Sequence, residues 1–449
     1  MKAGGLPAAG SLAQRVVGKT HDGLIVRGLL WGAAFVIGGK LASAAKEIVV
    51  AWRYGTSSQV DAYLFVFNLV TWPVAVWFAA LAGVLVPLVA RMRRGETAAF
   101  VRFRSELLAL TIGLGLLLGA LCWLGLTWVA GSTWVALPRE TAAAVVSVTA
   151  PMATLATLGT VTCLLSAWMQ AGQCHANTLF EGIPAVAIAI AVLLVPIGGI
   201  DALVYGTLVG FALHLLSLML ALQRTGDIEP PALPLRSPYW PAFRSGFGAM
   251  VAGQALLALA AVLDQFFAAQ LNVGAVSTLA YANRVLALLL GIGVTVVARA
   301  TLPVFSAASH DEVASLWTTA RRWTFIVFIA GMATTFSGWW MARPGVELLF
   351  QRGAFTPGDG EAVAHVLQHG LLQLPFYFAA VVLQSFMSAR GRYRAIALVS
   401  GACILAKAAA SAWLVPRHGL AGLQWATAIM FAVFSIGLLV VNAVRTSDR

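Results

Sequence analysis

Long apolar runs recur along the whole chain, and short polar segments separate them. Each run has about the 20 residues that an α-helix needs to cross the hydrocarbon core of a bilayer. The pattern therefore predicts twelve membrane-spanning helices and no soluble domain. The predicted spans are Leu29–Trp52, Val60–Ala90, Leu107–Ala130, Ala142–Gln170, Leu179–Pro196, Ala202–Leu222, Phe247–Leu271, Thr278–Val304, Trp323–Met341, Glu361–Met387, Ala395–Val415 and Leu420–Val441.

The two halves of the chain echo each other. The longest polar interruption between spans, rich in proline and charge, falls between the sixth and the seventh. In each half, a proline follows a polar residue of the second span by nineteen positions, at Asn68 with Pro87 and at Arg284 with Pro303. We therefore expect two six-helix lobes related by a pseudo-twofold axis along the membrane normal. The predicted parts are a cytoplasmic tail (1–28), a first lobe (29–222), a cytoplasmic linker (223–246), a second lobe (247–441) and a cytoplasmic tail (442–449).

Composition and charge agree with an all-α polytopic membrane protein. The chain is 60% hydrophobic and 10% charged, with a mean hydropathy of +0.86. With the N-terminus inside, the predicted cytoplasmic segments hold nineteen Lys and Arg, against five on the opposite side. Basic residues are retained in the cytoplasm, so both termini are predicted to be cytoplasmic. The net charge of +12 then reflects topology and affinity for anionic membrane lipids rather than for nucleic acid.

Three charges interrupt the first predicted span, at Lys40, Lys46 and Glu47. A charge at membrane depth costs at least a few kcal/mol on insertion scales, so it persists where it faces protein, water or a charged cargo. The functional interpretation is that Lys40 and Lys46 hold an anion in a central cavity while Glu47 orients or neutralises one ammonium. The alternative is snorkelling lysines with a structural Lys46–Glu47 contact.

Other polar groups could line the same space. Asp61 starts the second span, Asn68 lies two turns further, and Arg284 lies in the eighth span. A guanidinium at membrane depth is a good phosphate ligand, although it could instead donate to a carbonyl of a neighbouring helix. Lys407, in the eleventh span, could snorkel or reach the cavity.

The sequence gives little indication of catalysis or of a cofactor. Glu361, His365 and His369 share one helix face, but an amphipathic helix end explains them better than a metal site does. The four cysteines are scattered, without a CxxC motif or an obvious pair. We expect neither a metal nor another cofactor, and no enzyme activity: a polyprenyl-linked glycan polymerase or ligase would need a larger external loop than the eighteen or so residues predicted here.

The segment "ASAAKEIVVAWRYGTSSQVDAYLFVF", followed by "VLVPLVARM", resembles the opening of the MurJ (MviN) lipid II flippases of the MOP exporter superfamily, which is also the superfamily of the MATE transporters. The later segments "YANRV", "LPVFS", "LLFQRGAFTPGD", "ARGRYRA" and "GLAGLQWATAI" resemble the same family. The resemblance covers roughly Gly38 to the end. It implies a V-shaped, MATE-like bundle of two lobes, a cationic central cavity, and a place in the bacterial inner membrane.

The resemblance also implies roles for particular residues. Lys40 and Lys46 stand where the family has arginines, Glu47 stands for an aspartate, and Asp61 and Arg284 match. The family's aspartate before the cavity arginine is Asn283 here. The expected function is translocation of an undecaprenyl-diphosphate-linked saccharide, lipid II or a related cell-envelope precursor, from the cytoplasmic to the periplasmic leaflet. The alternatives are an exopolysaccharide or O-antigen repeat-unit flippase and a multidrug antiporter of the same superfamily.

Overall fold

The structure is a computed structural model that describes residues 38–92, 97–132, 135, 137–171, 176–195, 198–224, 226, 229–233, 235–307, 313–390 and 392–447. The predicted tail 1–28 and the first residues of the first predicted span lie outside these ranges. Within them the chain is helical apart from turns and connections, and no strand occurs. The prediction of an all-α protein is therefore confirmed.

Each of the twelve predicted spans overlaps a helix or a helix pair. The first described helix covers residues 38–54. The other helices are α2 (Ser58–Met92), α3 (Thr97–Gly131), α4 (Arg139–Ala171), α5 (Ala176–Phe180), α6 (Ile183–Leu194), α7 (Asp201–Arg224), α8 (Trp240–Ala269), α9 (Ala275–Ala307), α10 (Val313–Phe350), α11 (Pro357–Leu371), α12 (Leu374–Ala389) and α13 (Tyr393–Ser447). By length and hydropathy alone, six described helices could cross a membrane, or seven if α11 and α12 form one bent span.

Glycine and proline explain where the long helices break or bend. The first helix ends at Gly55, which has a φ of 56° that favours glycine. Thr356 and Asp359 form a capping box at the start of α11, with Pro357 in its first turn. Gly419, with a φ of 55° and a ψ of −135°, interrupts α13 and separates the two spans predicted there.

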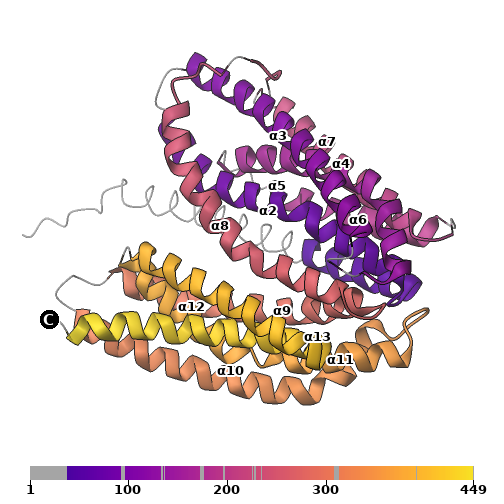
Figure 1. Cartoon of the computed structure of the whole chain (residues 1–449). Helices are drawn as coiled ribbons and strands as arrows, with labels where there is room; N and C mark the ends of the chain where they lie inside the picture. Colours follow the sequence, from indigo (N-terminus) through magenta and orange to yellow (C-terminus); the bar gives the residue numbers. More distant parts are fainter. Residues whose placement is uncertain are drawn as a thin grey trace, which may run out of the picture.

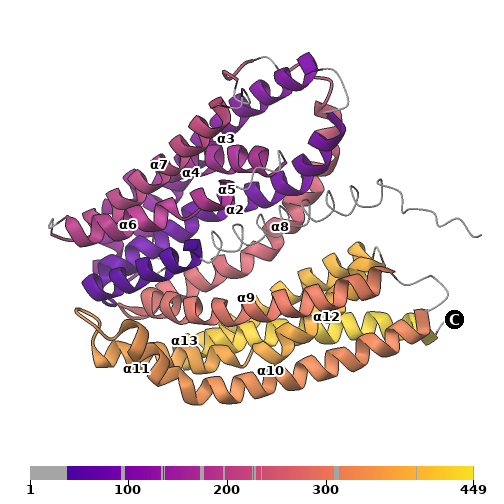
Figure 2. The same cartoon turned by 180° about the vertical axis from the view of Figure 1, so that it is seen from behind.

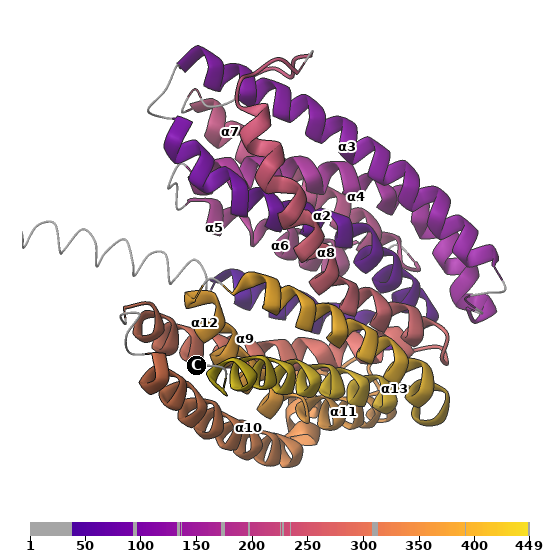
Figure 3. The same cartoon turned by 60° about the vertical axis from the view of Figure 1, so that its left-hand side comes forward.

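The helices form two groups that diverge from a shared end (Figures 1 and 2). Residues 38–54 and α2–α7 form the first group, termed the N-lobe, in which α2 and α3 pack on α4. Helices α9–α13 form the second group, termed the C-lobe. Helix α8 lies between them and packs on both α2 and α13 (Figure 3). The C-terminal end of α13 lies at the diverging end (Figure 1).

The buried side chains explain this shape. At the shared end, one hydrophobic cluster contains residues of both lobes, including Phe65 and Val276. Toward the diverging end, the clusters are separate. One, around Phe103 and Trp240, joins the N-lobe to the start of α8, and another, around Trp317 and Phe386, belongs to the C-lobe. Among the described residues, burial of apolar surface therefore holds the lobes together at the shared end.

Candidate functional site

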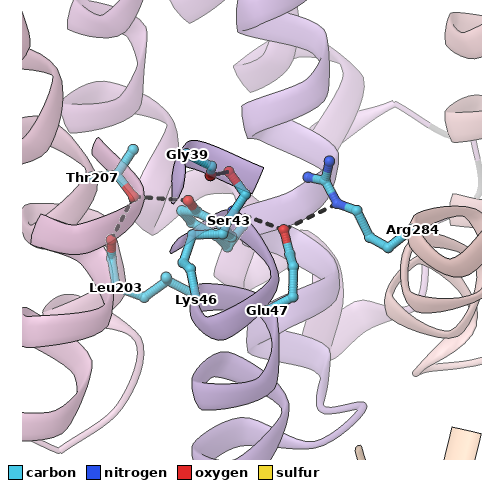
Figure 4. A network of polar contacts seen from close by, with 8 residues as sticks. Gly39, Ser43, Lys46, Glu47, Leu203, Thr207 and Arg284 are labelled. Atoms are coloured by element: carbon cyan, nitrogen blue, oxygen red, sulfur yellow. Dashed lines mark hydrogen bonds and ion pairs between the residues drawn. The ribbon is translucent and has the colours of Figure 1, made fainter. Parts of the chain in front are cut away.

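The main candidate site is an ion-pair cluster that joins the two lobes (Figure 4). Glu47, on the first described helix, is 9% exposed. Its Oε1 atom lies 2.8 Å from Nζ of Lys46 and 3.0 Å from Nε of Arg284 on α9. One carboxylate oxygen thus binds a cation from each lobe. The predicted proximity of Lys46, Glu47 and Arg284 is found in the structure.

The cluster presents an exposed cationic group. The Arg284 side chain is 51% exposed, and Figure 4 shows its two terminal nitrogens pointing away from Glu47. Nε is the Arg284 atom paired with the carboxylate, so the two terminal nitrogens remain available as donors. Two cations and one carboxylate leave a net charge of +1. Lys40 is exposed seven residues before Glu47, on the same side of the helix, and would add a second positive charge.

Two of the other predicted site residues serve different contacts. The Asp61 carboxylate accepts hydrogen bonds from the backbone N–H groups of Gly274, at 2.6 Å, and Ser277, at 2.7 Å. It therefore ties α2 to the first turn of α9 and does not join the ion-pair cluster. Asn283 accepts a hydrogen bond from Gln424 at 3.0 Å, inside the C-lobe. Asn68 is half-buried on α2.

The shared end of the lobes is held by hydrogen bonds of backbone and side-chain groups. Besides the Asp61 bonds, the Ala354 N–H donates to the Trp52 carbonyl at 2.7 Å, and the Tyr281 hydroxyl donates to the Gly55 carbonyl at 3.2 Å. Thr56 donates to Asp359. These five interactions are termed the clasp. All of them link the segment from Trp52 to Asp61 with the C-lobe.

Glycines make the clasp sterically feasible. A Cβ on Gly55 would lie 2.7 Å from the Ala354 carbonyl oxygen, and a Cβ on Gly274 would lie 2.9 Å from the Thr56 carbonyl oxygen. A Cβ on Gly353 would crowd Trp52. All three glycines have positive φ, so a side chain there would be strained as well as crowded. Most of "LLFQRGAFTPGD" lies here, which gives this motif a structural role in joining the lobes.

Sequence reasoning missed the partner of Lys407. This lysine is 1% exposed, and its Nζ lies 2.7 Å from Oδ2 of Asp264 on α8. It does not snorkel. The two residues are 143 positions apart, so no local pattern links them. The presence of an acidic residue within the seventh predicted span could have indicated that a buried cation pairs with it. Among the described residues, no group of three or more His, Cys, Asp or Glu side chains could hold a metal ion.

The family model and the curated relatives agree on one family. The family model "Lipid II flippase MurJ" matches residues 50–446. A probable lipid II flippase MurJ of Helicobacter pylori strain J99 is 28% identical over 190 residues, 42% of this chain and 41% of that protein. Its counterpart in Bdellovibrio bacteriovorus is 27% identical over 247 residues, 53% of this chain and 46% of that protein. The chain thus spans less than half the length of these curated relatives.

Solved structures show the same fold at low sequence identity. A structure of the lipid II flippase MurJ in an inward closed conformation matches with a TM-score of 0.78 and 16% identity, over 92% of this chain and 87% of that one. An inward-facing multidrug transporter of the MATE family, in the MOP superfamily, matches with a TM-score of 0.69 and 14% identity, over 91% and 95%. An outward-facing MATE transporter gives 0.57 and 15% identity, over 92% and 93%.

Proposed function

Because the chain belongs to the MurJ family of lipid II flippases, we propose that it moves an undecaprenyl-diphosphate-linked saccharide from the cytoplasmic to the periplasmic leaflet of the bacterial inner membrane. The polyprenyl tail stays in the lipid while the headgroup passes between the lobes. The observation that supports this proposal most directly is the cluster of Lys46, Glu47 and Arg284, which places cationic groups of both lobes at one point.

The cluster would bind the diphosphate by ion exchange. In the empty carrier, Glu47 occupies one oxygen-binding position between Lys46 and Arg284. A diphosphate carries more negative charge and more acceptor oxygens than a carboxylate does, so it competes for the exposed terminal nitrogens of Arg284. Glu47 then limits the cost of an empty cationic cavity without blocking cargo.

The clasp would serve as the periplasmic gate. With both termini in the cytoplasm, as the nineteen-to-five basic asymmetry favours, residues 38–54 run outward and the clasp lies on the periplasmic side. The lobes then diverge toward the cytoplasm, ready to receive cargo there. Transport requires the clasp to open while the other ends of the lobes approach each other, which is alternating access.

Complementation tests the proposed function. The chain should restore growth when the host's own lipid II flippase is depleted, whereas Arg284→Ala at equal membrane abundance should not. Arg343→Ala is a matched control, because this exposed arginine lies outside the cluster and pairs with Glu347 on its own helix. If a well-inserted wild-type chain fails to restore growth but restores export of an exopolysaccharide or O-antigen, the cargo is the repeat unit and not lipid II.

A further inference from the structure

A buried ion pair between α8 and the C-lobe takes no part in the proposed diphosphate site. Lys407 on α13 and Asp264 on α8 meet at 2.7 Å, and the lysine side chain is 1% exposed. Taking two charges out of water costs several kcal/mol per ion, and the pair regains this only with good geometry and additional hydrogen bonds. Ionisable residues inside membrane segments commonly mark ion or proton pathways.

The pair borders a cavity of about 490 Å³ between α8, α9, α12 and α13. Leu286, Ile404 and Phe431 are among its apolar lining residues, and Asn283, Gln373 and Gln424 are polar ones. The cavity is many times larger than the roughly 30 Å³ that a water molecule takes up in the liquid, and polar groups line it, so water can enter.

The Asp264 carboxylate is only half satisfied. Oδ2 accepts from Lys407, but the buried Oδ1 has no hydrogen-bond partner. Burying a carboxylate oxygen without a hydrogen-bond donor costs free energy, because its negative charge is not solvated. A bound proton would remove this charge and so lower the cost. The other titratable groups lining the cavity are Tyr377 on α12 and Cys403 on α13, whose unperturbed forms are neutral at pH 7. From α9 the cavity is faced by Asn283, Leu286 and Leu290, none of which titrates.

We propose that Asp264 is a proton-binding site and that proton loading releases Lys407, loosening α8 from α13. A proton from cavity water adds to Oδ1, giving a neutral carboxylic acid. Lys407 keeps its own proton and its positive charge, so the site passes from net zero to +1. The electrostatic attraction between the two helices is then lost.

The position of α8 gives this event a route to the lobes. Helix α8 packs on α2 of the N-lobe as well as on α13, so a weaker α8–α13 contact favours a different position of the lobes relative to each other. Asn283, which borders the cavity, directly precedes Arg284 of the diphosphate site on α9. Resting on the proposed flippase function, the inference is that a pH gradient contributes to the transport cycle through Asp264.

Infrared difference spectroscopy of the cargo-free protein tests proton binding directly. Acidification should produce the C=O stretch of a buried carboxylic acid in the wild type. Asp264→Asn should lose this band, and the matched control Asp201→Asn, which alters an exposed carboxylate at the start of α7, should keep it. Retention of the full band in Asp264→Asn would overturn the proposal, and so would its displacement by sodium at constant pH.

Transport supplies the second readout, measured in proteoliposomes with the membrane potential held at zero. For one proton per cycle, the wild-type flipping rate should rise by up to about tenfold per unit of pH gradient. The variant Asp264→Asn/Lys407→Gln keeps a neutral hydrogen-bonding pair and should flip without responding to the gradient; a wild-type response in this variant would refute the coupling. A pH-sensitive infrared band in a wild-type protein that moves no lipid-linked saccharide would contradict the proposed function and leave the proton site standing.

Discussion

The effect of an Asp61 substitution on opening of the clasp can be predicted quantitatively. The Asp61 carboxylate accepts the buried N–H groups of Gly274 at 2.6 Å and Ser277 at 2.7 Å, and both bonds cross between the lobes. If the clasp is the periplasmic gate, these bonds exist only while that side is closed. Asp61→Asn preserves the shape of the side chain, but it replaces one of the two acceptor oxygens with a donor and removes the charge.

The expected magnitude follows from the two bonds. Hydrogen bonds to charged groups contribute about 1.5–3 kcal/mol each. Losing one of them should shift the equilibrium between closed and open clasp by about 2 kcal/mol, or about 30-fold toward open. Asp61→Ala loses both acceptors and should shift it further. Once the clasp opens, water can accept hydrogen bonds from the freed N–H groups. The substitution therefore raises the free energy of the closed state and not that of the open state.

Thiol labelling measures the open population. Val276 is 1% exposed in the lobe contact, so Val276→Cys, in a background without native cysteines, reacts with a membrane-impermeant maleimide only when the clasp opens. When closing is fast relative to labelling, the labelling rate follows the open population. We expect about 30-fold faster labelling with Asp61→Asn and no change with Asp201→Asn. Equal rates with Asp61→Asn and the parent, in well-inserted protein, would refute the gate role and favour Asp61 as a cargo ligand.

Four further outcomes are expected. At equal membrane abundance, Lys46→Ala should abolish flipping and Lys46→Arg should retain much of it, because the positive charge at this position binds the diphosphate. Wild-type flux in Lys46→Ala would contradict this. Gly353→Ala should open the clasp in the same labelling assay, since its Cβ would crowd the opposite lobe, and unchanged labelling would argue against close backbone contact. Reporter fusions after Gly246 and Arg449 should both report the cytoplasm, and a periplasmic signal at either would overturn the topology. An inside-negative potential set with valinomycin should accelerate flipping at clamped pH, because each negative charge carried outward gains about 2.3 kcal/mol per 100 mV; rates that ignore the potential would exclude this driving force.

Local patterns in the sequence predicted the helices well. Runs of apolar residues located the long described helices, because membrane depth demands both apolar surface and internally satisfied backbone. The short α5 lies mostly outside the predicted spans, and α11 and α12 were predicted as one span. The ends were less accurate: α8 begins at Trp240, seven residues before the predicted Phe247. Trp240 is 7% exposed, and its indole N–H donates to Glu106 at 2.6 Å. The segment around Trp240 is polar, and for that reason it was predicted to belong to the linker. Tertiary contacts stabilise it as the first turn of α8.

The candidate site was only partly predictable, because pairing between distant helices leaves no local pattern. Lys46 and Glu47 are adjacent, so their contact was foreseeable, and Arg284 was expected to line the same space. Asp61 was expected there as well. In the structure its carboxylate accepts hydrogen bonds from N–H groups at the start of α9, which have no acceptor within their own helix. The contact between Lys407 and Asp264 depends on how α13 packs against α8.

Reconstitution of the purified chain with lipid II tests whether the cluster of Lys46, Glu47 and Arg284 carries a diphosphate headgroup across the membrane. In proteoliposomes, the wild type should move lipid II between leaflets, Arg284→Ala should fall to the rate of protein-free vesicles, and Arg343→Ala should match the wild type. A soluble diphosphate should slow the wild type by competing for the cluster of Lys46, Glu47 and Arg284. Wild-type rates in Arg284→Ala, or no lipid II movement by folded wild-type protein, would contradict this role of the cluster.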